Sequence, residues 1–287
     1  MNAERRTESE GTGQPSNLRL RVISALILAP VALAAVWFGG LVYSVFVAAA
    51  CLLLLHEWMK IVGGSFPQVD AIASFIALFG ALVLGHVGQY LPAVVLLFAG
   101  ALLVAVVLRF NASHKWMAEG LVYAGLSGIS LIALRTGEHG LVVIFFLLGI
   151  VWATDIAAYF AGRSIGGPKL WPKVSPKKTW SGALGGLMAA LIVGAIFSYF
   201  TGAGFPVAWI GAALVLSVAS QFGDLFESAV KRRFDVKDSG TLIPGHGGIM
   251  DRVDGLVAGG VVLYFLAVAA TGNFADPIGE LVALYGT

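Results

Sequence analysis

Charged side chains are scarce in this chain, where Asp, Glu, Lys and Arg make up only 12% of 287 residues. Soluble domains carry about a quarter charged residues, and a soluble globule of this size needs more polar surface than this chain supplies. The composition therefore excludes a soluble domain. Hydrophobic residues at 58% and a mean hydropathy of +0.88 predict an all-α polytopic membrane protein.

Cysteine is nearly absent too. Because the single thiol, Cys51, lies inside an apolar run, no intrachain disulfide can form, and we expect this thiol to be buried. No internal repeat is evident in the sequence either. Transporters are often built from inverted repeats, so this absence argues against a transporter with intramembrane acids, which stays an alternative.

Apolar runs of membrane-spanning length fill most of the chain. They lie near 22–40, 41–60, 70–87, 91–108, 119–135, 141–162, 181–201, 206–230 and 255–271. We therefore expect about nine transmembrane helices, the first of them uncleaved. Residues 1–21 are polar and are predicted to form a disordered cytoplasmic tail, and residues 272–287 a short C-terminal tail.

The placement of Lys and Arg predicts the orientation. With nine spans, every Lys and Arg except Arg135 falls on one side of the membrane, which the positive-inside rule assigns to the cytoplasm. The N-terminus is then cytoplasmic and the C-terminus outside. The two most cationic loops, 163–180 and 231–254, share the cytoplasmic face.

Acidic residues occur where three of these spans end or begin. Asp224, Glu227, Ser228 and Lys231 are spaced i, i+3, i+4 and i+7, so they share one helix face. A carboxylate in the hydrocarbon is costly and is usually functional or paired. A helix end at which Lys231 merely neutralises Glu227 is the plainer alternative, although Asp224 lies a further turn into the membrane. Asp155 is also embedded in an apolar run, and a structural hydrogen-bonding role is its plainer alternative.

The segment from 231 to 255 is the most polar stretch of the chain. Its glycines lie beside cations, where backbone N–H groups can approach a phosphate closely. Asp251 and Asp254, three residues apart at the start of the last span, can face one point. Oxygen donors alone suit Mg²⁺ rather than zinc, and His246 has no second His or Cys nearby. An ordinary flexible loop does not explain the dense alternation of acids and bases.

Both cationic loops and the acids therefore meet at the cytoplasmic membrane surface. For the Lys-rich loop, attraction to anionic headgroups at about 1 kcal/mol per cation is the plainer reading. Attraction to headgroups would not require the buried acids, however. The residues together predict a site for a polyanionic, metal-bound ligand beside lipid, such as a nucleoside triphosphate reacting with a lipid phosphate.

The segment Ser228–Asp254 resembles the signature of phosphatidate cytidylyltransferases, also called CDP-diacylglycerol synthases. It contains S-x-x-K-R, then K-D, then P-G-H-G-G-x-x-D-R-x-D, while "DIAAYFAGRSIGG" and "SPKKTWSG" resemble the family's other landmarks. The resemblance is strong over about 150–260. Ser181 departs from it, because the family has Glu just before Gly182.

The resemblance implies transfer of CMP from CTP to phosphatidate with Mg²⁺. The lipid phosphate is already ionised, so the reaction needs charge neutralisation and alignment rather than a base. The expected catalytic residues are Asp224, Lys231, Asp251 and Asp254, and the expected metal ligands are Asp224, Asp251 and Glu227. The expected substrate contacts are Asp155, Arg163, Ser175, Lys177, Lys178, Ser228, Arg232, Lys237, His246 and Arg252.

By the same resemblance, residues 22–150 are N-terminal membrane helices and residues 151–271 are catalytic membrane helices with cytoplasmic loops. The expected location is a bacterial inner (plasma) membrane, with the active site facing the cytoplasm, CTP and phosphatidate as partners, no nucleic acid, and a homodimer left open. A CTP-dependent polyprenol kinase is the neighbouring alternative, but it would need a base for its lipid alcohol. The D-G-x-x-A-R motif of CDP-alcohol phosphotransferases is absent.

Overall fold

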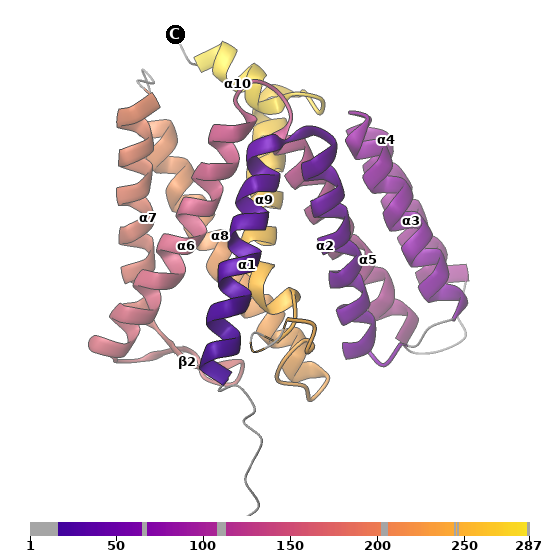
Figure 1. Ribbon diagram of the computed structural model, residues 1–287, viewed down its shortest axis with the longest axis horizontal. Helices are drawn as coiled ribbons and strands as arrows, with labels where there is room; N and C mark the ends of the chain where they lie inside the picture. The colour runs from indigo at the N-terminus through magenta and orange to yellow at the C-terminus, as the bar shows by residue number, and fades with distance from the viewer. Residues whose placement is uncertain are drawn as a thin grey trace, which may run out of the picture.

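The computed structural model describes residues 17–64, 68–107, 113–201, 206–243, 245 and 247–285, and these are largely helical (Figure 1). The helices are α1 (Asn17–Phe38), α2 (Gly40–Ile61), α3 (Val69–His86), α4 (Tyr90–Leu102), the π-helical turn η1 (Leu103–Val107), α5 (Ser113–Arg135), α6 (Gly140–Ser164), α7 (Trp180–Thr201), α8 (Pro206–Arg233), α9 (Met250–Thr271) and α10 (Pro277–Tyr285). Among the described residues one antiparallel hairpin forms, from β1 (Lys169–Trp171) and β2 (Ser175–Thr179).

Within the described ranges, seven helices are long and apolar enough to cross a membrane: α2, α3, α5, α6, α7, α8 and α9. The apolar parts of the two remaining predicted spans are shorter, at Val22–Phe38 in α1 and Tyr90–Val106 in α4 and η1. The expectation of a helical membrane protein is confirmed. Nine spans would require α1 and α4 to cross as well.

Several boundaries differ from the sequence prediction. Helix α1 begins at Asn17, inside the predicted tail, because Leu and Arg at 18–21 are good helix formers; residues 1–16 lie outside the described residues. The loop 163–180 contains the hairpin. The predicted C-terminal tail contains α10, whose first residue Pro277 and first-turn Glu280 both favour a helix start. The boundary at 150/151 falls inside α6.

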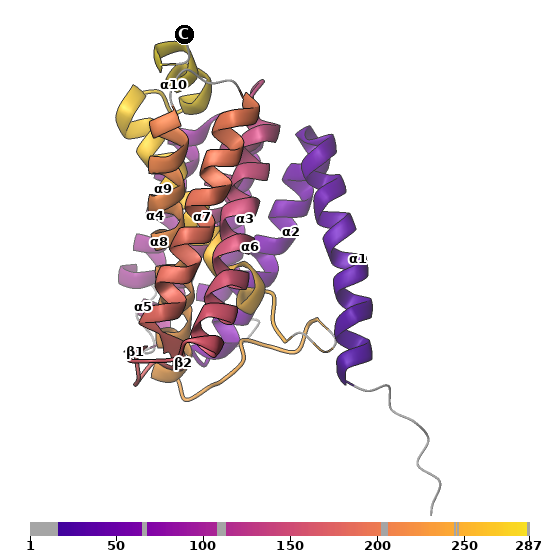
Figure 2. The same ribbon diagram turned by 90° about the vertical axis from the view of Figure 1, so that its left-hand side faces the viewer.

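Helix α5 lies at the centre of the bundle. Of its span, 78% is buried, against 22–44% for the other six. It contacts α2, α3, α4 and α9, and the views in Figures 1 and 2 show α1 and α7 at the periphery. Trp58 of α2 is fully buried, and its Nε1 donates a 2.6 Å hydrogen bond to the Trp116 carbonyl of α5. The N-terminal helices thus share one core with α8 and α9.

The start of α1 and the hairpin lie at one end of the bundle, and α10 lies at the other (Figure 1). Arg135, the one cation that the sequence assigns to the opposite side, lies at the α10 end. Its Nε and Nη2 donate to the carbonyls of Val36 and Trp37, at 2.7 and 3.1 Å. These carbonyls lie at the end of α1, where they have no helical partners, and Arg135 supplies their hydrogen bonds. This contact explains why Arg135 lies at the α10 end, apart from the other cations.

Candidate active site

Three carboxylates from α8 and α9 form the centre of the site. Ligand oxygens of Asp224, Glu227 and Asp254 all lie within 4.8 Å of one another. Asp224 and Glu227 are one turn apart on α8, while Asp254 lies in the second turn of α9. Gly223 allows this approach, since a Cβ there would lie 2.6 Å from the Asp254 carbonyl oxygen. The two backbones therefore meet at the level of the acids.

Two lysines partly balance these acids. The Lys231 Nζ donates to Glu227 Oε2 at 3.0 Å and to Asp251 Oδ1 at 2.5 Å. Lys178, carried by β2, forms an ion pair with Asp224 Oδ2. Two ammonium groups thus face four carboxylates. Carboxylates this close repel one another unless more positive charge lies among them.

Glu227 indicates where further positive charge belongs. It is 1% exposed, and its Oε1 is buried with no hydrogen-bond partner, whereas Oε2 contacts Lys231. A buried carboxylate oxygen without a partner is costly. The cluster offers only oxygen donors from three carboxylates, which is the donor set that Mg²⁺ prefers. The residues of this cluster therefore fit the metal that the sequence resemblance implies.

Asp251 has a different environment from the one predicted. Its Oδ2 accepts hydrogen bonds from the Ser239 amide, the Ser239 hydroxyl and the Gly248 amide, at 3.0, 2.9 and 3.2 Å. Helix α9 begins at Met250, so Asp251 in its first turn faces the polar segment, and Asp254 lies beside α8. Asp224 is thus grouped with Glu227 and Asp254, and Asp251 is linked to Glu227 through Lys231, while direct metal binding by Asp251 stays a prediction.

Glu57 of α2, which the sequence patterns did not predict, also belongs to the site. Its carboxylate accepts from the amides of Ile249 and Met250 and from the Ser239 hydroxyl, each at 2.9 Å. It therefore satisfies free N–H groups at the start of α9, where a negative charge is also favoured. The signal was present in "LLLLHEWMK", a lone carboxylate within an apolar run near the end of a span. The same criterion selected Asp155.

The polar segment 231–255 is narrowed to a turn between Ile243 and Gly247. Ile243 and Gly247 exchange two backbone hydrogen bonds of 2.9 and 3.1 Å, and Gly247 has a φ of 89°, a left-handed conformation that favours glycine. His246, predicted to contact substrate, lies outside the described residues. Ser239 bridges Glu57 and Asp251, so the residues on either side of this turn are fixed to both α2 and α9.

The hairpin carries Lys178 toward α8. Thr179 Oγ1 accepts a 3.1 Å hydrogen bond from the Gly182 amide and so caps α7. Ser181, where the sequence resemblance predicts Glu, donates to the Gly166 carbonyl at 2.5 Å and ties the start of α7 to the segment that follows α6. Asp155 is exposed on α6 and lies within electrostatic range of Asp224 and Lys178.

Two of the other predicted substrate contacts donate to groups outside the carboxylate cluster. Arg163 donates to the Tyr159 hydroxyl at 2.9 Å, and Arg232 to the Val236 carbonyl at 3.0 Å. The Ser228 hydroxyl makes a long 3.4 Å hydrogen bond to Asp224. The remaining predicted contacts in the two cationic loops are exposed or half-buried: Ser175, Lys177, Lys237 and Arg252.

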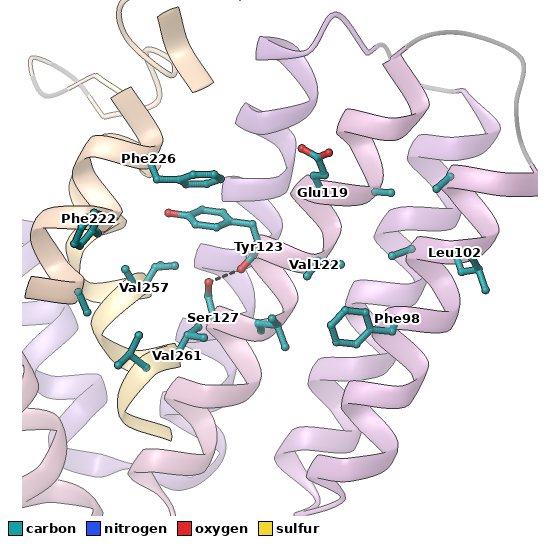
Figure 3. A pocket seen from close by; sticks show the side chains of 18 residues that line it. Phe98, Leu102, Glu119, Val122, Tyr123, Ser127, Phe222, Phe226, Val257 and Val261 are labelled. Atoms are coloured by element: carbon teal, nitrogen blue, oxygen red, sulfur yellow. Dashed lines mark hydrogen bonds between the residues drawn. The ribbon is translucent and has the colours of Figure 1, made fainter. Parts of the chain in front are cut away.

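An apolar cavity of about 980 Å³ adjoins the acids (Figure 3). It lies between α4 and α5 on one side and α8 and α9 on the other. Gly223 and Phe226 line it, and each directly precedes one of the acids, Asp224 and Glu227. A charged centre with cations on one side and an apolar cavity on the other is suited to an amphipathic phosphate.

Known proteins share this chain's sequence over most of its length. A family model described as the cytidylyltransferase family matches residues 19–270. Proteins named phosphatidate cytidylyltransferase are 43% identical in Brucella suis biovar 1, over 91% of this chain and 96% of the relative, and 39% identical in Bacillus subtilis, over 74% and 76%. The one in Staphylococcus aureus strain COL is 36% identical, over 83% and 94%. The chain belongs to the cytidylyltransferase family.

Proposed function

We propose that the chain is a phosphatidate cytidylyltransferase, which transfers CMP from CTP to phosphatidate and yields CDP-diacylglycerol and pyrophosphate in phospholipid synthesis. Relatives with that name cover most of the chain. The structural observation that supports this function is the Asp224, Glu227 and Asp254 cluster, which has Lys178 and Lys231 beside it and an apolar cavity behind it.

The reaction needs alignment and charge neutralisation. An ionised oxygen of the phosphatidate phosphate attacks the α-phosphorus of CTP. A new P–O bond forms there, the bond to the oxygen bridging the α- and β-phosphorus atoms breaks, and pyrophosphate leaves with that electron pair. Lys178 and Lys231, held by carboxylates, present ammonium groups toward the phosphates.

Asp224, Glu227 and Asp254 would hold Mg²⁺, which when bound neutralises triphosphate charge. Asp251, predicted as a direct ligand, is proposed to orient Lys231 and the polar segment. The exposed cations of the two loops, among them Lys177, are proposed to attract the nucleotide. The further contacts proposed from the sequence are Asp155, Arg163, Ser175, Ser228, Arg232, Lys237, His246 and Arg252.

The proposed topology has nine spans, a cytoplasmic N-terminus and an outside C-terminus in a bacterial inner membrane. Its support is the distribution of Lys and Arg, together with the placement of the hairpin and the start of α1 at one end of the bundle and α10 at the other. The active site would then face the cytoplasm.

The test is product analysis with purified protein in detergent. With CTP, Mg²⁺ and phosphatidate, we expect pyrophosphate release and transfer of the cytidine label into lipid, each dependent on phosphatidate. A polyprenol kinase would instead release CDP and phosphorylate a polyprenol, and a transporter would leave CTP intact. Either of those outcomes would overturn the proposal.

A further inference from the structure

The apolar cavity lies next to the acids, because Gly223 and Phe226, which line it, directly precede Asp224 and Glu227. Its walls on α8 and α9 include Ala219 and Gly223, and Val257, Ala258, Val261 and Val262. From Asp254 to Val262 the axis of α9 advances about 12 Å, at about 1.5 Å per residue. A ligand with its charged group at the carboxylates could therefore reach about 12 Å along α9, of which the last five residues, about 7.5 Å, run along the cavity wall.

Tyr123 of α5 lines the cavity and places its hydroxyl between the carboxylates and the apolar wall. Its ring packs against Trp58 and Phe226, with centroid separations of 5.5 and 5.7 Å. Figure 3 shows the ring extending beneath Phe226 with its hydroxyl directed toward α8. That hydroxyl lies within electrostatic range of Glu227 and Asp254.

The Tyr123 hydroxyl is buried and has no hydrogen-bond partner. Burying an unpaired hydroxyl is costly, so the position calls for a ligand that supplies an acceptor. Phe222 and Phe226, which flank the hydroxyl on α8, are 66% and 47% exposed, so their rings have room to turn as a ligand enters.

In a diacyl lipid phosphate, ester carbonyls lie between the phosphate and the hydrocarbon chains. On the basis of the proposed function, we propose that the cavity holds the acyl chains of phosphatidate and that the Tyr123 hydroxyl donates a hydrogen bond to an ester carbonyl. Tyr123 is then a specificity-determining residue that favours ester-linked lipid phosphates over ether-linked ones, because an ether analogue lacks the carbonyl acceptor.

The test removes the Tyr123 hydroxyl from the enzyme and the ester carbonyl from the lipid, separately and together. Wild type and Tyr123→Phe are assayed in mixed micelles with CTP and either diacyl phosphatidate or its dialkyl ether analogue of equal chain length. We expect Tyr123→Phe to raise the KM for diacyl phosphatidate about two- to tenfold, the range of one net hydrogen bond, and to leave the KM for CTP and for the ether analogue unchanged. Tyr199→Phe, which removes a hydroxyl from an 81% exposed side chain on α7, is the control and should match wild type.

An equal loss on ester and ether substrates would mean that Tyr123 acts only through packing, and no loss on either would mean that its hydroxyl meets no carbonyl. Each result overturns the proposal. Failure of the proposed function is separate, since wild type would then lack activity on diacyl phosphatidate.

The cavity has its own test. Val261→Trp fills a position that lines it, whereas Leu266→Trp adds the same ring to an exposed site on α9 outside the lining. We expect Val261→Trp to raise the KM for long-chain phosphatidate at least about threefold more than for a short-chain form, whose retained turnover reports a folded enzyme. If both chain lengths respond alike, or if Leu266→Trp produces the same selectivity, the chains lie elsewhere.

Discussion

Asp254 and Asp251 are three residues apart and have different partners. Asp254 belongs to the oxygen cluster with Asp224 and Glu227, and Asp251 is bonded to Lys231 and Ser239. The S-x-x-K-R to D-R-x-D signature could identify both acids, but only the start of α9 at Met250 decides which of them joins Asp224 and Glu227.

This difference predicts different metal dependence. Asp254→Asn should lower turnover at least about tenfold and raise the Mg²⁺ concentration for half-maximal rate, because it removes charge from the cluster without changing volume. Asp251→Asn should lower turnover with a much smaller change in Mg²⁺ requirement. Rates measured across a Mg²⁺ titration separate the two, and the reverse order would return Asp251 to the direct ligand position.

Lys231 is predicted to act on both stability and nucleotide binding. Its side chain is 11% exposed and contacts two carboxylates that are 2% and 8% exposed. Lys231→Ala leaves both without their cation, so we expect a loss of about 3 kcal/mol in the free energy of unfolding and a KM for CTP that rises more than the KM for phosphatidate. Thermal unfolding and steady-state kinetics measure these, with Lys60→Ala, at an exposed position on α2, as control. A change confined to the KM for phosphatidate would reverse the substrate roles assigned to this face.

At the scale of helices, α2 supports the site from a distance. Ile249 donates to Glu57 across 192 positions of sequence. A pattern within one segment cannot reveal such a contact, because which helix covers the start of α9 depends on packing of the whole bundle. Apolar runs therefore predicted the helices well, while the capping carboxylate and the hairpin that carries Lys178 appeared only in the fold.

Glu57→Gln tests that support. The amide removes the charge and keeps the shape, so the bundle should fold while the Ser239 and Ile249 contacts weaken. We expect turnover to fall about 10- to 100-fold, as for other residues that hold catalytic groups in place. Hydrogen exchange should rise in residues 239–250 and stay unchanged in α3. Full turnover with unchanged exchange would contradict a positioning role.

Gly223 tests the approach of α8 to α9. In Gly223→Ala the new methyl would lie 2.6 Å from both the Asp254 carbonyl oxygen and Ala258, so the helices must separate. We expect a loss of about 1–3 kcal/mol in stability together with weaker catalysis. Gly211→Ala, on the same helix with nothing within 4 Å, should be neutral or stabilising by up to about 1 kcal/mol. Equal effects of the two changes would argue against a tight crossing.

At the scale of the whole molecule, the cation count and the fold agree on which segments share an end. The hairpin and the start of α1 lie together, and α10 lies opposite (Figure 1). Arg135 interrupts the cation pattern because it satisfies α1 carbonyls, a reason that its sequence neighbours do not reveal. Composition could predict the membrane class, because it follows from the bilayer as solvent, and the sidedness that the charges indicate stays a prediction.

Sidedness can be measured with single cysteines. Cys51 is buried, so its labelling background should be low, and replacing it by Ala leaves a thiol-free chain. Glu138 and Lys177 are both exposed and are separated by α6 alone. We expect a membrane-impermeant thiol reagent to label Glu138→Cys in spheroplasts and Lys177→Cys only in inverted vesicles.

Lys237→Cys extends this experiment across two more helices, α7 and α8. An even number of crossings returns the chain to the same face, so Lys237→Cys should be labelled like Lys177→Cys, and a thermal unfolding transition like that of the thiol-free chain should show that each variant is folded. Labelling of Lys177→Cys from outside would place the Lys178–Asp224 ion pair on the external side. Because cytoplasmic CTP could not then reach the carboxylates directly, that single result would contradict the topology and the nucleotide access proposed for this enzyme.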